Sequence, residues 1–219
     1  MELQYQFPVW KQLTPDQQQT LQKTAYQRKV PAGTVIQDGT MDCIGPVLVC
    51  SGQFRAYILS EEGREVTLYR LFEMDMCLMS ASCMMPNIQF EVIIEAEKDS
   101  EIWIIPPHVF KKLMKENVAV SNYINDLMSS RFSDVMWTME QVMFKSFDRR
   151  LADFLVKESQ IEGTNVLKIT HEKIANHLGS AREVVTRMLR YFQGEGLVTL
   201  TRGTVELTNE KALRKLADS

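Results

Sequence analysis

The stretch ITHEKIANHLGSAREVVTRMLRYFQGEGLV, residues 169–198, decides the fold of the C-terminal part of the chain. Thr170 is a preferred N-cap residue, because its hydroxyl can accept a hydrogen bond from an exposed amide of the first helical turn. Gly179 is suited to the end of a helix, where the backbone often needs a positive φ. We therefore expect a short helix over residues 171–178, closed by Gly179.

A capping box marks a second helix directly after the turn. Ser180 and Glu183 stand three residues apart, so we expect this helix to begin at Ser180 and to end near Phe192, before Gly194 and Gly196. Apolar residues of both helices repeat at helical spacing and should face inward. They are Ile174, Ala175, Leu178, Val184, Val185, Met188, Leu189 and Phe192.

Polar and basic side chains are left on the outward face of the second helix. An arginine offers a planar fork that matches the O6 and N7 acceptors of guanine, and a glutamate can accept from the N4 amine of cytosine. Arg182, Glu183 and Arg187 are therefore candidates to contact adjacent base pairs. The alternative is an ordinary solvated helix face, which is the usual role of an isolated group of charges.

A small hairpin is expected after the second helix. Residues 197–200 and 204–207 alternate in polarity around Thr201, Arg202 and Gly203, which makes the unit a winged helix-turn-helix. Helix caps, turn and wing together favour DNA binding over a solvated surface. The further candidate DNA contacts are Ser180, Thr170, His171, Thr186 and Arg202.

These features resemble the DNA-binding domain of the Crp/Fnr family of bacterial transcription regulators. The residues that carry the resemblance are Thr170, Gly179, Ser180, Arg182, Glu183, Val185, Arg187, Gly196 and Leu197. The resemblance implies that Arg182, Glu183 and Arg187 touch bases in the major groove of double-stranded DNA. Ala181 departs from the family, which usually has serine there, and one phosphate hydrogen bond is lost with it.

Composition and charge are those of a globular protein with an uneven charge distribution. The 219 residues suffice for two domains, and the net charge is −3. Residues from Ser146 onward carry 12 basic and 10 acidic side chains, against 13 and 18 before it. A net charge of +2 leaves much of the DNA affinity to a few placed contacts and to dimerisation. Without a signal peptide or membrane-spanning stretch, we expect a cytoplasmic protein that does not contact membranes.

The N-terminal half is predicted to be a β roll after short helices over residues 1 to about 28. Thr14 and Pro15 are suited to the N-cap and first position of one of these helices. Short strand-like runs with turn residues between them predict an antiparallel roll. The runs are 30–36, 47–50, 53–59, 65–71, 89–96 and 101–105. This half resembles the family's jelly-roll sensor domain, which is related to cyclic-nucleotide-binding modules.

A long helix is expected over residues 117–145, which contain neither glycine nor proline. Its apolar residues are spaced by four and three, and this heptad seam consists of Met128, Phe132, Val135, Met139 and Val142. The stripe could pack on its own sensor domain. However, a helix of about 28 residues is about 42 Å long, more than a small domain covers, so we expect a parallel homodimer. Asp148 is expected to cap the next helix, over 149–158.

The sensor pocket departs from the members of the family that bind cyclic nucleotides. Where those members have a Gly-Glu and an Arg-Ser pair, this chain has Leu78-Met79 and Phe90-Glu91, and the hydroxyl pair of the long helix reads Val135-Met136. A phosphate needs a cation or well-aimed amides, so we expect an effector other than cyclic AMP. The candidate pocket residues are Cys77, Leu78, Met79, Ser80, Cys83, Phe90, Glu91, Val135 and Met136.

The cysteines offer an alternative signal. Cys77 with Cys83, or Cys43 with Cys50, could make the protein redox- or metal-responsive, whereas buried cysteines most often act as small apolar residues. No two cysteines form a CxxC pair, and an intracellular setting makes disulfides unexpected. Neither the iron–sulfur layout of the family nor a haem-binding histidine is present, so we expect no cofactor and no metal.

These observations predict an α+β protein of three parts. They are a jelly-roll sensor domain over 1–116, a dimerisation helix over 117–145 and a winged helix-turn-helix over 146–219. The expected function is that of a transcription regulator, not an enzyme, that binds a palindromic DNA site as a homodimer. Its expected partners are DNA, a second copy of the chain and an unknown small-molecule or redox effector, with RNA polymerase as a further candidate.

Overall fold

The computed structural model describes residues 2–38, 43–84 and 91–218, which fold as two compact units. The first comprises Met1–Ile58 and Leu68–Val135, and the second comprises Leu59–Thr67 and Met136–Ser219. The α+β class is confirmed, with antiparallel sheets first, then a long helix and a helix-turn-helix. The division at residues 116 and 145 stays a prediction.

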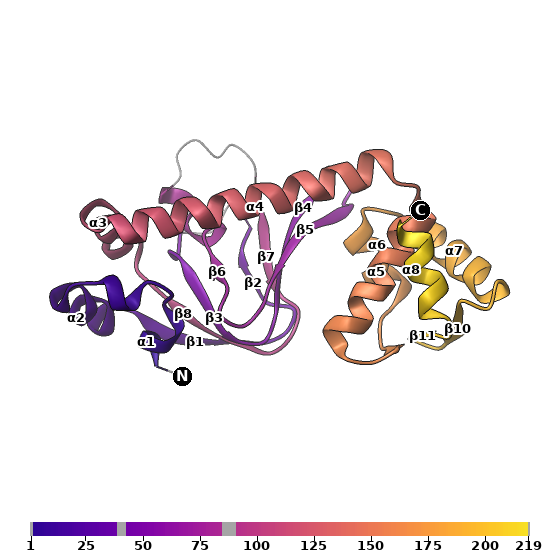
Figure 1. The fold of residues 1–219 in the computed structure, drawn as a ribbon, viewed down its shortest axis with the longest axis horizontal. Helices are drawn as coiled ribbons and strands as arrows, with labels where there is room; N and C mark the ends of the chain where they lie inside the picture. Colours follow the sequence, from indigo (N-terminus) through magenta and orange to yellow (C-terminus); the bar gives the residue numbers. More distant parts are fainter. Residues whose placement is uncertain (1, 39–42, 85–90, 219) are drawn as a thin grey trace. The chain divides into compact units, whose positions relative to one another are not determined.

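The first unit is a roll of two four-stranded sheets with helices before and after it (Figure 1). The strand orders are β1-β8-β3-β6 and β2-β7-β4-β5, and the strands pair antiparallel, as in β1 with β8 and β4 with β7. The elements are α1 (Leu3–Gln6), η1 (Trp10–Gln12), α2 (Pro15–Thr24), β1 (Tyr26–Val30), β2 (Val35–Gln37), β3 (Val47–Ser51), β4 (Phe54–Leu59), β5 (Glu65–Leu71), β6 (Met76–Cys77), η2 (Met79–Met84), β7 (Ile93–Ala96), β8 (Ser100–Ile104), α3 (Pro107–Glu116) and α4 (Val118–Phe144).

The N-terminal segment holds one confirmed expectation and one correction. Thr14 caps α2: its hydroxyl accepts from the Gln17 amide, and the Gln17 side chain accepts from the Thr14 amide. The helical region ends earlier than expected, because residues 26–30 form β1. The cause is distant in sequence, since Tyr26 pairs with Ile104 across the sheet.

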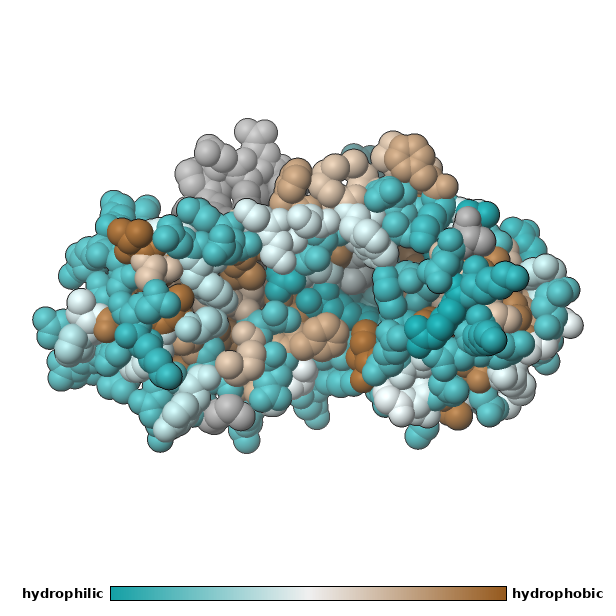
Figure 2. All heavy atoms as spheres, viewed as in Figure 1, coloured by the Kyte–Doolittle hydropathy of each residue, from teal (hydrophilic) through white to brown (hydrophobic). Residues whose placement is uncertain are grey.

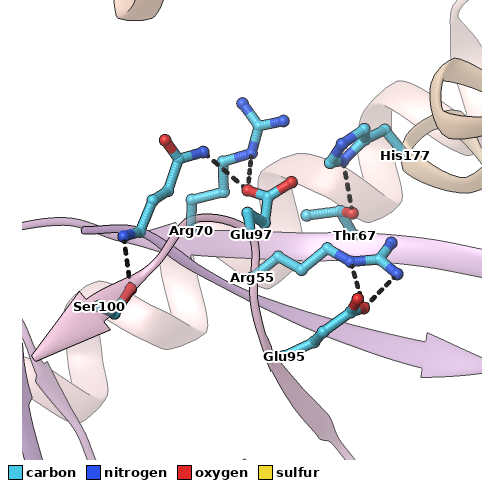
Figure 3. Close-up of polar contacts among 8 residues, drawn as sticks. Arg55, Thr67, Arg70, Glu95, Glu97, Ser100 and His177 are labelled. Carbon is cyan, nitrogen blue, oxygen red and sulfur yellow. Dashed lines mark hydrogen bonds and ion pairs between the residues drawn. The ribbon is translucent and has the colours of Figure 1, made fainter. Parts of the chain in front are cut away.

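Alternation along β4 and β7 separates an apolar core from a charged face. Phe54 and Ala56 on β4 are fully buried in the core of the roll, as is Ile94 on β7. The intervening residues Arg55 and Glu95 form an ion pair at 2.6 Å on the opposite face (Figure 3). Period-two alternation of this kind places every second side chain on the same face of a strand.

Helix α4 is one continuous helix of 27 residues, and it lies along the roll (Figure 1). Val120 and Ile124 are buried against the helices α2 and α3 and the strands of the first unit, and Met128 and Val135 pack partly on its cores. Among the residues that the structure describes, no helix has both the length and the apolarity needed to cross a membrane.

The second unit packs four helices and a three-stranded sheet, ordered β10-β11-β9, around one core. Asp148 does not cap α5, which corrects the sequence-based expectation. Ser146 holds the extended N-cap backbone, and its carbonyl accepts from the Arg150 amide, so Asp148 lies in the first turn. The elements are α5 (Phe147–Glu162), β9 (Val166–Leu167), α6 (His171–Leu178), α7 (Arg182–Gly194), β10 (Val198–Thr201), β11 (Thr204–Leu207) and α8 (Glu210–Asp218).

Residues 59–67, the tip of the β4–β5 hairpin, belong to this second unit by contact. Val66 forms an antiparallel β-bridge with Leu178, at the end of α6. Thr67 Oγ1 lies 2.9 Å from His177 Nδ1 (Figure 3). Gly179 has a φ of +64°, and a Cβ added to it would lie 2.6 Å from Val66 Cγ2. Position 179 therefore requires glycine for two reasons: the backbone has a positive φ, and Val66 leaves no space for a Cβ atom.

Replacing Gly179 with alanine tests this close approach, and Gly163 provides a matched control. Both glycines have a φ of +64° at a helix C-terminus, but a Cβ at Gly163 would meet no atom within 4 Å. Gly163→Ala should lower the free energy of unfolding by about 1–2 kcal/mol, the cost of a left-handed alanine. Gly179→Ala should cost more, because Val66 must move as well. Urea denaturation followed by circular dichroism measures both.

A double variant separates backbone strain from crowding. Adding Val66→Ala to Gly179→Ala should recover the excess cost over Gly163→Ala, because the clashing Cγ2 atom is gone. Equal costs for the two single glycine variants would contradict the packing of Val66 on the turn.

Candidate nucleic-acid interface

Helices α6 and α7 form the predicted helix-turn-helix. The expected first helix, 171–178, is confirmed, and the Thr170 hydroxyl caps it by accepting from the Lys173 amide at 3.1 Å. Gly179 ends α6 in the left-handed conformation. The Ser180 amide then donates to the Ala175 carbonyl at 3.0 Å, which closes the turn.

The capping box predicted at Ser180 and Glu183 is wrong. Ala181 occupies the N-cap position with φ −85° and ψ 145°, without a capping side chain, and α7 begins at Arg182. The physical reason is the turn itself, since the Ser180 amide already bonds to Ala175. Glu183 consequently lies in the first turn of α7, where a carboxylate is favoured by the helix dipole.

Helix α7 presents the predicted charged face. Val185, Leu189 and Phe192 are fully buried in the core of the second unit. The side chains of Arg182, Glu183, Arg187 and Arg190 are exposed. Because apolar residues at helical spacing fix one side of the helix, the charges are left on the side that can reach a ligand.

Thr186 and His171 join the two helices of the motif. Thr186 Oγ1 lies 2.9 Å from His171 Nδ1 and donates to the Arg182 carbonyl at 2.9 Å. Burial lowers the pKa of His171, and the positive charges of Arg182 and Arg190 lower it further. The two candidate DNA contacts are thus in direct contact with each other.

The expected wing is present as the hairpin β10–β11. Val198 pairs with Leu207 and Thr201 with Thr204, and Gly203 takes the positive φ of the connecting turn. Arg202 is exposed at the tip of this hairpin. A contact of Arg202 with DNA stays a prediction.

Sequence reasoning missed Arg150, which supports the turn from α5. Its Nη1 donates to the Leu178 carbonyl at 2.9 Å, and its guanidinium lies 5.5 Å from the ring centre of Phe147. Burial lowers the pKa of Arg150, although a guanidinium stays charged at neutral pH. Spacing along the chain gives no signal for this contact, because residues 150 and 178 lie on different helices.

Four of the nine candidate pocket residues, Cys77, Leu78, Met79 and Ser80, are buried inside the first unit. Cys77 and Met79 pack in the core of the roll, and Leu78 packs in the neighbouring core. Ser80 is fully buried, and its hydroxyl donates to the Gly45 carbonyl at 2.8 Å. Glu91 and Met136 are exposed, and Val135 is half-buried. Phe90 and the side chain of Cys83 lie outside the described residues, so the contact of this set with an effector stays a prediction.

Three arginines of the first unit, Arg55, Arg70 and Arg131, are paired with carboxylates. Arg131 on α4 bonds Asp134 at 3.0 Å and Asp75 at 3.3 Å, and it lies 4.8 Å from the ring centre of Tyr69. Arg55 and Arg70 are paired with Glu95 and Glu97 (Figure 3). The pair of Arg131 and Asp75 leaves no local signal in the sequence, because its members are 56 residues apart along the chain.

The cysteines behave differently from the expectation that no disulfide forms. Cys43 is disulfide-bonded, whereas Cys50 and Cys77 are buried free thiols. Disulfide formation depends on which sulfur atoms the fold brings together, which spacing along the chain does not reveal. Burial raises the pKa of the Cys50 thiol and of the Cys77 thiol, so both stay protonated and unreactive at neutral pH.

The predicted seam of α4 divides into two sets. Met128 and Val135 are half-buried against the roll, whereas Phe132, Met139 and Val142 are exposed by 67, 46 and 45 %. Met136 and Met143 are exposed as well, so that an apolar stripe at spacings of four and three faces outward. Apolar side chains gather along α4 at the upper edge of Figure 2. The stripe consists of Phe132, Met136, Met139 and Met143.

A roll, a long helix with an exposed apolar stripe and a winged helix-turn-helix are the architecture of a DNA-binding regulator. Comparisons support this class. A model of the Crp-like helix-turn-helix domain matches residues 149–216. A protein of the Crp/Fnr family from Eubacterium rectale ATCC 33656, described as a transcriptional regulator, is 59% identical, with a TM-score of 0.96. The similarity covers 98% of this chain and 100% of that one.

Two more distant relatives are similar over most of the chain. Transcriptional regulator SdrP from Thermus thermophilus is 26% identical over 177 residues, which cover 78% of this chain and 83% of that protein. The Cyclic AMP receptor protein of the same organism is 25% identical over 170 residues, 78% of each chain. The chain belongs to the Crp/Fnr family of transcriptional regulators, which are not enzymes, and it carries their helix-turn-helix DNA-binding domain.

Arg150→Met tests the support of the turn. The variant keeps the apolar stem but leaves the Leu178 carbonyl without its donor, so the free energy of unfolding should fall by about 1–3 kcal/mol. Thermal and urea denaturation measure the loss. Arg149→Met is the matched control, because Arg149 makes no side-chain hydrogen bond or ion pair within the described residues. Equal stability of the two variants would contradict a supporting role for Arg150.

Proposed function

We propose that the protein binds a pseudo-palindromic DNA site as a homodimer and that an effector other than cyclic AMP controls this binding. The observation that carries the proposal is the exposed array of Arg182, Glu183 and Arg187 on α7, a helix whose other side is fully buried. Transcription regulation and the helix-turn-helix are properties of the family. The pseudo-palindromic DNA site, the homodimer and the effector are our proposal.

The arrangement of α7 supports direct contact with bases. Arg182 and Arg187 are five residues apart, and Glu183 lies in the first turn, so the N-terminal half of the helix carries all three groups. Arginine pairs bidentately with guanine and glutamate accepts from cytosine in the major groove. Thr170 is the N-cap of α6, Ser180 lies in the turn before α7 and Arg202 lies at the tip of the wing. We assign to these residues contacts with the phosphate backbone, which would orient α7 on the DNA.

The exposed stripe of α4 supports a second copy as the partner. Large apolar side chains repeat there at spacings of four and three, the pattern of a coiled-coil seam. A contiguous apolar face on a helix of 27 residues is unfavourable in water, and an identical stripe on a two-fold mate would cover it. Two-fold symmetry would then set two copies of α7 against two half-sites of a palindrome.

The ion pairs of the roll support an effector without a cyclic phosphate. Arg55, Arg70 and Arg131 each have carboxylate partners, so a phosphate would have to compete with them. Cys50 and Cys77 are poor candidates for the redox or metal alternative, because thiol chemistry requires the thiolate. Among the cysteines whose side chains the structure describes, this leaves the disulfide-bonded Cys43 as the candidate for a redox response.

Selection of bound fragments from a random duplex library tests the proposed DNA site and the proposed dimer. The enriched sites should contain two inverted half-sites about one helical turn apart, roughly 10 base pairs from centre to centre. Enrichment of a single half-site would contradict the dimer, and no enrichment at all would contradict sequence-specific binding.

Arg187→Ala should weaken binding to the selected duplex by about 1–3 kcal/mol and relax the base preference at one position of each half-site. The loss follows from removal of a bidentate base contact. Fluorescence anisotropy and a repeat of the selection measure the two effects. Lys211→Ala on α8 is the control, since it removes one exposed positive charge without touching α7. Equal effects of both substitutions would mean that Arg187 contributes only net charge.

Phe132→Glu combined with Met139→Glu should convert the protein to a folded monomer. In the dimer, the two carboxylates of one copy would be buried against those of the other across the two-fold axis. The free energy needed to bury these like charges would exceed what the remaining apolar contacts of the stripe contribute. Sedimentation equilibrium measures the mass. Tyr5→Glu, at another exposed aromatic residue, should leave the assembly unchanged. A dimeric double variant would contradict the stripe as the interface.

A further inference from the structure

The hydrogen bond between His171 and Thr186 fixes the position of the proton on the imidazole ring. Thr186 Oγ1 donates to the Arg182 carbonyl, which is four residues earlier on α7. A hydroxyl carries one hydrogen and two lone pairs, so Oγ1 has no second hydrogen for the ring. His171 Nδ1, 2.9 Å away, must therefore donate to Oγ1. The neutral ring is the Nδ1–H tautomer, and its Nε2 atom carries a free lone pair.

The free nitrogen lies at the edge of the proposed DNA-binding surface. His171 is the first residue of α6 and is half-buried, and its Nε2 atom makes no hydrogen bond within the part of the chain that the structure describes. Its partner Thr186 stands next to Arg187 in the sequence of α7. Exposed amides at a helix N-terminus and basic side chains are typical surroundings for a phosphate.

The charged side chains around the ring belong to α7 and to the chain on either side of His171. On α7, Arg182 and Arg190 act on the ring directly, and Glu183 and Arg187 lie on the same helix. The other charged neighbours along the chain are Lys168, Glu172 and Lys173, which are exposed. Burial and the two arginines lower the pKa of His171, so the ring is neutral in the free protein at neutral pH.

We propose that His171 is a proton-linked phosphate contact of this surface. On binding DNA, Nε2 takes up a proton from solvent and donates the resulting N–H to a backbone phosphate, while Nδ1 remains bonded to Thr186. The inference rests on the proposed DNA-binding function and adds a chemical property to it. Each subunit binds one proton with its half-site, and no covalent bond between heavy atoms is made or broken.

The sign of the pH dependence follows from linkage. A phosphate next to the ring favours the imidazolium and offsets the charges of Arg182 and Arg190, so the pKa of His171 is higher in the complex than in the free protein. Binding then takes up protons between the two values, and affinity falls as pH rises through this window. At pH values below the pKa of His171 in the free protein, the ring is already charged before binding, so DNA affinity no longer changes with pH.

Measuring operator affinity against pH tests the proposal. Fluorescence anisotropy is recorded with the selected duplex between about pH 5 and 8, at constant ionic strength. For the wild type, Kd should rise with pH by up to about tenfold per unit for each proton taken up. His171→Asn should have a flatter profile, because the Asn Nδ2 amide can still donate to Thr186 but cannot titrate. His171→Arg should bind with little pH dependence in this range.

Two further measurements keep the test independent of variant folding. Calorimetric titration of the wild type in buffers of different ionisation enthalpy should show uptake of up to one proton per subunit near neutral pH. His108→Asn, on α3 of the first unit, should leave the pH profile unchanged. No proton uptake, or an unchanged profile in folded His171→Asn, would overturn the inference. Absence of wild-type binding at every pH would instead overturn the proposed function.

Discussion

Burial of one side of α7 is the constraint on which the candidate interface depends. Val185, Leu189 and Phe192 are fully buried in the core of the second unit, so the helix cannot rotate about its axis without exposing them. Burying a side chain of this size contributes about 1.5–3 kcal/mol. The three residues together therefore hold Arg182, Glu183 and Arg187 on the outward side. The proposed contacts with DNA are, in this sense, a consequence of apolar packing.

The turn between α6 and α7 carries the second constraint. Gly179 provides a left-handed residue without a Cβ, and Arg150 satisfies the carbonyl of Leu178 at the end of α6. Val66 occupies the space that any larger residue at 179 would need. Residues 59–67 are consequently part of the unit that contains the helix-turn-helix. The contacts of this segment are with the end of α6 and with the turn that precedes α7.

Helix α4 combines two apolar faces with different partners. On the face of α4 toward the roll, Val120 and Ile124 are buried, and Met128 and Val135 are partly buried. This apolar face is therefore removed from water within the first unit. Arg131 lies between Met128 and Val135 along the helix, and its ion pair with Asp75 adds a polar contact that favours the same rotation of α4 on the roll as these apolar contacts. That rotation decides which residues form the outward stripe. The outward stripe consists of Phe132, Met136, Met139 and Met143.

The sequence alone was sufficient for the elements whose signals are local. Thr170 and Gly179 mark both ends of α6, residues 117–145 lack helix breakers, and the repeat of Val185, Leu189 and Phe192 shows which side of α7 is buried. These signals work because caps and helical periodicity act within a few residues. They also led to the Crp/Fnr family, and the structural relatives confirmed it.

Tertiary structure decided everything that joins distant residues. Ser180 is not the N-cap because its amide closes the turn on Ala175, and Tyr26 is in a strand because Ile104 pairs with it. The Cys43 disulfide, the Arg131 ion pair with Asp75 and the hydrogen bond from His171 to Thr186 leave no pattern along the chain. The exposed stripe of α4 also differs from the predicted seam, because periodicity identifies apolar faces but only packing determines which of them are covered.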